Sequence, residues 1–138
     1  MVRRSMSVLV GDDDASVVEC VVEILGGRGF EVHTAFCGSE ALQILVNSPI
    51  DLTILDIHFP DMTGFDVLDR YLEGPFVSDT ESGSVRRASR GPLPAIFMSG
   101  DVTPEAQHRC ERVGWPLLDK PFAVADMRAA IDRICEIS

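Results

Sequence analysis

The sequence predicts an α/β fold in which a doubly wound parallel sheet of five strands is covered by helices on both faces. Short β-branched or apolar runs alternate five times with amphipathic stretches of helical length. Such alternation is typical of parallel strands joined by crossover helices, and right-handed crossovers favour the doubly wound arrangement. The 138 residues are 46% hydrophobic, which is enough for one full core. We therefore expect residues 1–138 to form a single domain.

Each predicted element has its own local signal. The strands are short apolar runs, expected at Val8–Val10, Phe30–Ala35, Leu52–Leu55, Ala95–Met98 and Leu117–Leu118. The helices carry an apolar stripe at helical spacing and are expected at Ser16–Gly26, Ser39–Asn47, Gly64–Leu72, Thr103–Val113 and Val124–Ile137. Glycines stop the first helix, and Thr103 and Pro104 suit the N-cap and first position of the fourth.

One stretch, residues 74–94, breaks this alternation. It is rich in Ser, Gly, Arg and Pro and shows no periodicity, which predicts a flexible surface insert between the third helix and the fourth strand. Its segment Arg86-Arg87-Ala88-Ser89 has the form of a basophilic kinase site, but such short motifs often arise by chance. We favour plain disorder over a modification site or a partner-docking loop.

Composition excludes several classes of protein. The net charge is −10, from 12 basic against 22 acidic side chains, whereas nucleic acids and anionic membranes attract basic faces. The four scattered cysteines form no CxxC pair and have no nearby histidine at a zinc-ligand interval, so we expect them to be reduced. The first apolar run is too short for a signal peptide, and no stretch approaches a membrane span. We expect a cytoplasmic protein with neither a nucleic-acid nor a membrane partner.

Chemically active side chains follow four of the five predicted strands. Asp12 and Asp13 follow the first strand, Asp56 the third, Ser99 the fourth and Lys120 the fifth. The carboxyl ends of parallel strands share one edge of the sheet, where ligands bind in doubly wound folds. The sequence therefore predicts a functional site that gathers three carboxylates, a hydroxyl and an ammonium group.

These residue types suit phosphoryl transfer. Three neighbouring carboxylates repel one another at neutral pH and need a compensating charge. Mg²⁺ prefers such oxygen ligands, and the lack of histidine or cysteine beside the aspartates argues against zinc. Lys120 supplies a compact positive charge and Ser99 can donate a hydrogen bond to an oxyanion. A carboxylate can then attack while the cations neutralise the phosphoryl oxygens.

Four segments, VLVGDDDASV, LTILDIHFPDMTGFDVL, IFMSGD and LLDKPF, resemble in order and spacing the motifs of response regulator receiver domains. The resemblance covers nearly the whole chain. It implies a flavodoxin-like sheet with strand order 2-1-3-4-5. It also implies a non-enzymatic phosphoacceptor whose donor is a sensor histidine kinase or a phosphotransfer protein, with a possible downstream protein target.

The resemblance further implies a metal site. Asp13 and Asp56 would ligate Mg²⁺ through their carboxylates and His58 through its backbone carbonyl. Asp12 would contribute mainly through a metal-bound water. These four residues are the predicted metal ligands.

For the phosphoryl group itself, the resemblance implies three roles. Asp56 would be the nucleophile, Ser99 would contact the transferred group, and Lys120 would pair with it. The peptide bond between Lys120 and Pro121 would be cis, a geometry largely confined to proline.

Several positions depart from the receiver pattern. Gly11 stands where a branched apolar residue is usual, and Phe59 replaces the usual methionine before Pro60. Leu117 occupies the position three before the lysine, which is normally an aromatic residue. Trp115 lies nearby and either substitutes for that aromatic residue in part or anchors local packing.

Two other functions remain open from the sequence. A haloacid-dehalogenase-type phosphatase would use Asp12 and Asp14 after a strand, with Ser99 and Lys120. Against it, Asp56 would have no role, and the chain is short, without a cap domain. The second alternative is an interaction module with the receiver fold that works without phosphorylation.

Overall fold

The computed structural model describes residues 6–73 and 93–137. The predicted insert at residues 74–94 therefore lies outside the described residues, except for Leu93 and Pro94.

Five parallel strands form one sheet in the order 2-1-3-4-5. They are β1 (Ser7–Gly11), β2 (Glu31–Ala35), β3 (Leu52–Asp56), β4 (Ala95–Ser99) and β5 (Leu117–Asp119). The helices of the described residues are α1 (Ala15–Leu25), α2 (Gly38–Asn47), α3 (Gly64–Glu73), α5 (Pro104–Val113) and α6 (Val124–Ile137). Each boundary lies within one residue of the predicted one, and the predicted fold class and strand order are confirmed.

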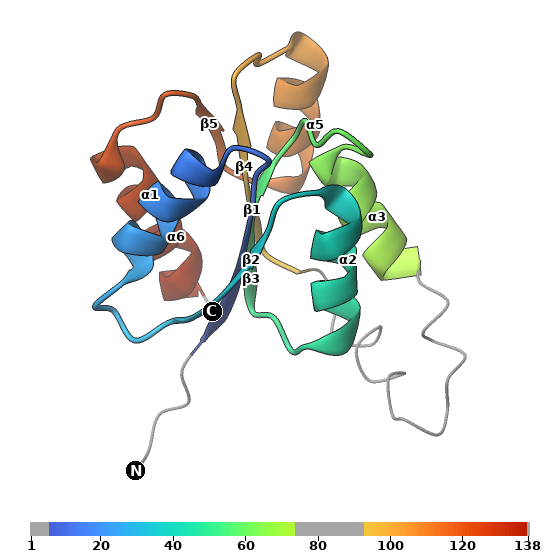
Figure 1. The fold of residues 1–138 in the computed structure, drawn as a ribbon. Coiled ribbons are helices and arrows are strands. Elements are labelled where there is room, and N and C mark those ends of the chain that lie inside the picture. The colour runs from blue at the N-terminus through green and yellow to red at the C-terminus, as the bar shows by residue number, and fades with distance from the viewer. Residues whose placement is uncertain (1–5, 74–92, 138) are drawn as a thin grey trace.

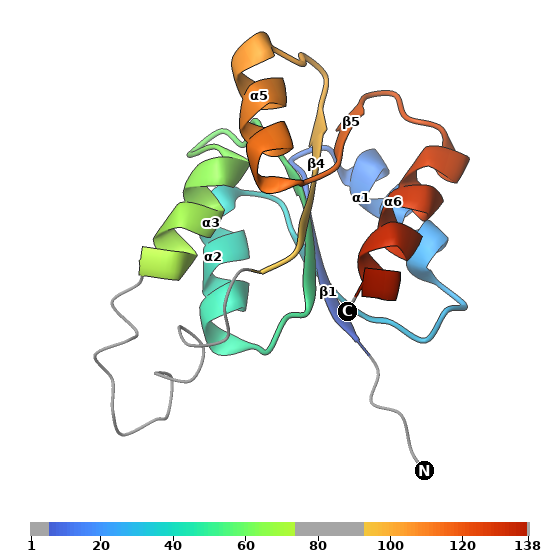
Figure 2. The ribbon, with the colours of Figure 1, turned by 180° about the vertical axis from the view of Figure 1, so that it is seen from behind.

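The sheet separates two layers of helices. Helices α1 and α6 cover one face, and α2, α3 and α5 cover the other (Figures 1 and 2). Along each strand the side chains alternate between these layers, so that Leu9, Leu55 and Phe97 face one core and Val10 and Met98 the other. Both faces of the three central strands are buried, which explains their continuous apolar runs.

Local signals set several of the helix ends. The Asp14 side chain accepts a hydrogen bond from the Ser16 amide and caps α1, and Thr103 caps α5 in the same way. Gly114, at φ 88°, ends α5 in the left-handed conformation. Helix α2 is different, because its N-cap residue Cys37 makes no side-chain capping bond.

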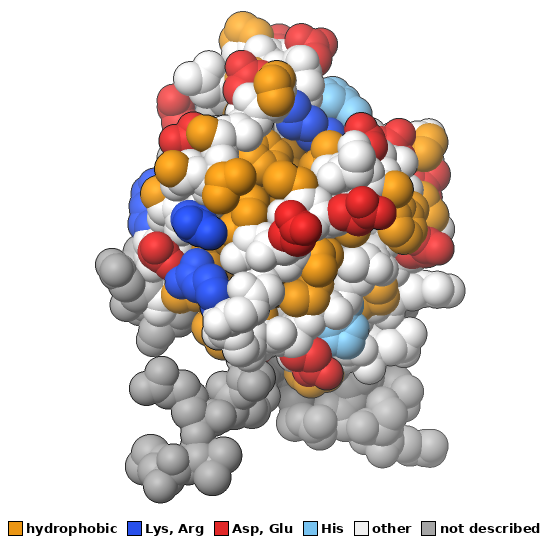
Figure 3. All heavy atoms as spheres, turned by 60° about the vertical axis from the view of Figure 1, so that its left-hand side comes forward, with side chains coloured by type: hydrophobic (Ala, Val, Ile, Leu, Met, Phe, Trp, Pro, Cys, Tyr) orange, Lys and Arg blue, Asp and Glu red, His pale blue; other side chains and the backbone are white. Residues whose placement is uncertain are grey.

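The surface shows how charge and apolar area are divided. On the side that carries α1 and α6, apolar side chains gather in the middle of the face, and acidic and basic side chains lie around them (Figure 3). Among residues 6–73 and 93–137, no helix is both long and apolar enough to cross a membrane.

Candidate functional site

The register of the sheet brings the predicted site residues to one edge. Gly11 of β1 pairs with Leu55 of β3, one residue before Asp12 and Asp56 respectively. On the other side of β3, Asp56 pairs with Met98, one residue before Ser99. The Lys120 amide donates to the Ser99 carbonyl at 2.8 Å. Strands β1, β3, β4 and β5 therefore place these side chains at their common carboxyl end, as predicted.

Three carboxylates meet at this edge. Asp12, Asp13 and Asp56 each offer an oxygen within 4.8 Å of the others. Asp12 is 0% and Asp56 3% exposed, whereas Asp13 is open to solvent. The cluster therefore has two buried acids at its base and one at its mouth.

Asp12 is the most constrained member of the cluster. Its Oδ1 accepts a hydrogen bond from the Asp14 amide at 2.9 Å. Its Oδ2 lies 2.6 Å from Lys120 Nζ, but no well-aligned hydrogen bond reaches this buried oxygen from the described residues. We interpret the short distance as a charge contact. Burial raises the pKa of Asp12 above its ordinary value, although Lys120 and the Asp14 amide act in the opposite direction.

Lys120 compensates part of the negative charge. Its Nζ lies 3.4 Å from Asp56 Oδ1 in addition to its contact with Asp12. Burial by itself would lower the pKa of Lys120, but the two carboxylates outweigh it and the pKa is raised. Lys120 therefore stays cationic at neutral pH. The bond between Lys120 and Pro121 is cis, as the resemblance implied.

The acid cluster fits a hard divalent cation. One ammonium group faces three carboxylates, so negative charge remains in excess, and a buried oxygen of Asp12 lacks a directed hydrogen bond. All the side-chain donors in the cluster are carboxylate oxygens, which suit Mg²⁺ better than softer metals. Asp12, Asp13 and Asp56 are the carboxylates that could hold the ion.

Two backbone amides organise the neighbouring polar groups. The His58 amide donates to Asp56 Oδ1 at 3.2 Å, and the His58 side chain is exposed. Ser99 is 0% exposed, and its hydroxyl oxygen accepts from the Asp101 amide at 3.0 Å. The hydroxyl hydrogen of Ser99 can therefore be donated to a ligand. That His58 offers its carbonyl to a metal stays a prediction.

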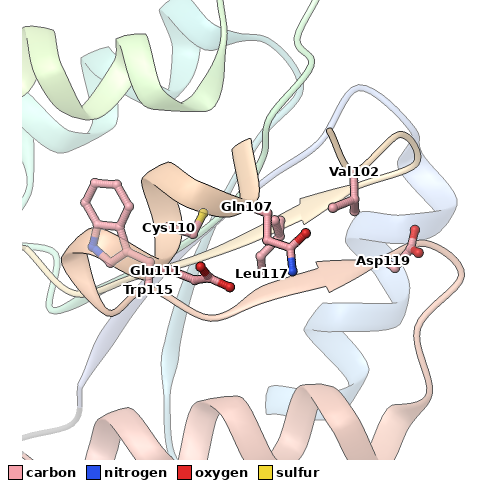
Figure 4. A pocket seen from close by; sticks show the side chains of 7 residues that line it. All are labelled: Val102, Gln107, Cys110, Glu111, Trp115, Leu117 and Asp119. Carbon is pink, nitrogen blue, oxygen red and sulfur yellow. The ribbon is translucent and has the colours of Figure 1, made fainter. Parts of the chain in front are cut away.

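The β4–β5 side departs from the receiver pattern, as Leu117 suggested. A hollow of about 410 Å³ lies between α5 and β5, and Leu117, Val102 and Asp119 are among its lining residues (Figure 4). The Trp115 ring packs on Phe97, with ring centroids 5.0 Å apart. Trp115 therefore packs at the start of β5, where Phe97 pairs with Leu117, whereas Ser99 pairs with Asp119 at the end of that strand. We interpret Trp115 as a packing anchor.

One polar residue near this edge, Asp61, was not singled out from the sequence. Asp61, in the loop between β3 and α3, accepts hydrogen bonds from the Gly38 and Ser39 amides at the start of α2. The available signal was that α2 is preceded by Cys37, which is not a favoured capping residue and makes no side-chain capping bond.

Fold and site together define a doubly wound α/β protein with an acid cluster and a lysine at the carboxyl edge of its sheet. The family model of the response regulator receiver domain matches residues 8–77, which is half of the chain. The chain belongs to the response regulator receiver domain family.

Individual relatives agree with this membership. Response regulator SaeR of Staphylococcus epidermidis is 37% identical over 73 residues, which cover 50% of this chain and 31% of that protein. Sensory/regulatory protein RpfC of Xanthomonas campestris pv. campestris is 29% identical over 125 residues, 90% of this chain and 16% of that protein. The chain thus spans less than a third of the length of these two relatives.

A solved structure supports the same fold over nearly the whole chain. The chemotaxis protein CheY4 of Vibrio cholerae has a TM-score of 0.74 and 25% sequence identity, and the match covers 95% of this chain and 99% of that chain.

Proposed function

We propose that this chain is the phosphoacceptor module of a two-component phosphorelay, and that Asp56 takes the phosphoryl group in the presence of Mg²⁺. The observation that carries the proposal is the setting of Asp56. It is buried at the end of β3, with two further carboxylates within 4.8 Å and Lys120 Nζ at 3.4 Å. Membership of the receiver family supports the same role.

The chemistry that fits this setting is transfer from a phosphohistidine. A carboxylate oxygen of Asp56 attacks phosphorus, and a P–O bond forms as the P–N bond breaks. The leaving imidazole nitrogen keeps the electron pair and takes up a proton. Lys120 pairs with one phosphoryl oxygen and the Ser99 hydroxyl donates to another, so charge on the transferred group is met from two sides.

Asp13, Asp56 and the His58 carbonyl are the proposed direct ligands of Mg²⁺, with Asp12 acting through water. When bound, the ion would neutralise charge on the transferred group and reduce the repulsion among the acids. Because the product stays attached to Asp56, we propose self-catalysed phosphorylation and dephosphorylation rather than turnover as an enzyme.

The proposed partners are a sensor histidine kinase or phosphotransfer protein as donor and a downstream protein as target. Nucleic acid and membrane are not proposed as partners, because the chain carries a net charge of −10. We propose that residues 1–138 act as one receiver domain in the cytoplasm, with residues 74–94 as an insert.

The dehalogenase-type alternative finds less support in the site. It would need Asp14 as a free acid, but the Asp14 side chain accepts from both the amide and the hydroxyl of Ser16 at the start of α1. These bonds lower the pKa of Asp14, so that it is a poor proton donor. The role left to Asp14 is a helix cap.

Intact-mass measurement after treatment with phosphoramidate tests the proposal. We expect one added phosphoryl group, dependent on Mg²⁺, stable in acid and labile in base. Asp56→Asn should abolish it, whereas Asp69→Asn, on α3 where the carboxylate pairs with Arg109 of α5, should not. A variant Asp56→Asn that is labelled at the wild-type rate would exclude Asp56 as acceptor. Absence of labelling in the wild type would favour the interaction module, and multiple turnovers of a phosphomonoester would favour the phosphatase.

A further inference from the structure

The loop between β3 and α3, residues 57–63, is held on both sides of Pro60. It begins directly after Asp56, and its ends are joined by a hydrogen bond from the Gly64 amide to the Ile57 carbonyl at 2.9 Å. Any ligand atom that the loop backbone offers, including the carbonyl of His58, depends on the place of this loop. The role inferred for this loop therefore rests on the proposed magnesium site.

The first contact joins the loop to β1. Phe59 is 7% exposed, and its ring occupies the space beside Gly11. A Cβ atom built on Gly11 would lie 3.0 Å from Phe59 Cζ and 3.0 Å from Leu55 Cδ2. Gly11 immediately precedes Asp12 and Phe59 immediately follows His58. The two departures from the receiver pattern at these positions therefore compensate each other. The loop carries a larger side chain, and the strand carries none where that ring lies.

The second contact joins the loop to α2. Asp61 Oδ1 accepts from the Gly38 amide at 2.8 Å and Oδ2 accepts from the Ser39 amide at 2.9 Å. These amides lower the pKa of Asp61, so the carboxylate stays charged at the positive end of the helix. Met62 closes the contact, because a Cβ on Gly38 would lie 2.3 Å from Met62 Cγ.

We propose that Phe59 and Asp61 are positioning residues for the metal site. Phe59 fixes the loop against the end of β1, and Asp61 fixes it against the start of α2. Together they set where the His58 backbone lies relative to the acids of β1 and β3. Groups that orient metal ligands without touching the ion commonly affect metal affinity strongly.

Removal of the Asp61 contact gives the first test. Asp61→Ala should raise the dissociation constant for Mg²⁺ about tenfold, measured by titration calorimetry on the full chain well below its melting temperature. Asp61→Asn keeps one acceptor oxygen, so its dissociation constant for Mg²⁺ should lie between those of the wild type and Asp61→Ala. Thr103→Ala is the matched control, because it removes a capping bond from α5. Helix α5 has the same length as α2, ten residues.

A double-mutant cycle tests the Gly11–Phe59 contact. Gly11→Val should clash with the ring and weaken Mg²⁺ binding about tenfold. Phe59→Met in the same chain should restore most of the affinity, because the flexible side chain makes room. Such a rescue is non-additive, as expected of residues in contact. A double variant that binds no better than Gly11→Val would overturn the role of Phe59.

The Asp61 variants also distinguish failure of the positioning role from failure of the proposed magnesium site. Wild-type affinity in Asp61→Ala, or an equal loss in Asp61→Ala and Thr103→Ala, would overturn its positioning role while labelling of Asp56 still supported the proposed function. A wild-type chain that binds no Mg²⁺ would instead overturn the proposed magnesium site, and this inference with it.

Discussion

The edge formed by β1 and β3 and the side formed by β4 and β5 follow the receiver pattern to different degrees. At the first, the predicted acids Asp12, Asp13 and Asp56 lie within 4.8 Å of one another. At the second, Leu117 stands where an aromatic residue is usual, and a hollow of about 410 Å³ adjoins it. Charged groups act through a few atoms at fixed places, whereas apolar space can be filled from several directions.

The second region has its own packing solution. Phe65, Phe97 and Trp115 form an aromatic cluster with centroid separations of 4.7, 5.0 and 6.3 Å. Arg109 of α5 lies over the Phe65 ring at 4.5 Å and pairs with Asp69 of α3 at 2.7 Å. The cluster thus holds α5 against α3, and Trp115 packs beside Phe97, which pairs with Leu117 at the start of β5. We infer that the two regions can be perturbed separately.

The largest expected effect comes from Lys120→Met. Asp12 and Asp56 would lose their cation, so the free energy of unfolding should fall by about 3 kcal/mol and the rate of Asp56 phosphorylation about a hundredfold. Denaturant unfolding and intact-mass kinetics measure the two effects. Lys120→Arg is the control that keeps the charge but alters its geometry. Unchanged stability in Lys120→Met would show that Asp12 does not depend on this contact.

Asp13→Asn should change the free energy of unfolding in opposite directions in Mg²⁺ and in EDTA, through the acid cluster of β1 and β3. Mg²⁺ at a hundredfold excess over its dissociation constant should stabilise the wild type by about 2.7 kcal/mol. The variant should lose most of that gain because a ligand is missing. In EDTA it should be up to about 1 kcal/mol more stable than the wild type, since repulsion is relieved at an exposed site. Calorimetry of both proteins in both buffers measures these changes. If the variant were less stable than the wild type in EDTA and still stabilised by Mg²⁺, Asp13 would have a structural role instead.

Trp115→Ala should perturb only the second region. Loss of a partly buried ring from the aromatic cluster should cost about 2 kcal/mol of stability, while the rate of phosphorylation stays that of the wild type below the melting temperature. Trp115→Phe should retain most of the stability. A fall in phosphorylation rate as large as that of Lys120→Met would show that the two regions are not separable.

Patterns close in sequence predicted most of the molecule. The alternation of apolar runs and amphipathic stretches predicted every described element to within one residue. The acid cluster was predicted because strand ends meet at one edge in any parallel sheet. The Asp14 side chain caps α1 through the Ser16 amide two residues later, a contact of the kind that local capping patterns describe.

Contacts between distant segments could not be predicted in the same way. Gly11 and Phe59 were each noted as a departure, but nothing local shows that one compensates the other. Asp61 caps a helix that begins 23 residues earlier in the chain, beyond the reach of any capping motif. The packing role of Trp115 depends on Phe65 and Phe97 from other elements. Such contacts depend on the tertiary arrangement.

Leu117→Tyr should have the smallest effect on stability, and it tests whether the hollow beside β5 can accept an aromatic ring. An aromatic ring at this position can extend into the hollow that Leu117 already lines, so the free energy of unfolding should change by no more than about 0.5 kcal/mol. Leu118→Tyr is the matched control on the same strand, because Leu118 packs against the opposite core and overpacking there should cost about 1–3 kcal/mol. Trp115 lines the same hollow, so its fluorescence should change in Leu117→Tyr and not in Leu118→Tyr. Equal destabilisation by both substitutions would mean that the hollow cannot accept a ring, and that Leu117 is fixed by packing rather than by loss of an aromatic residue.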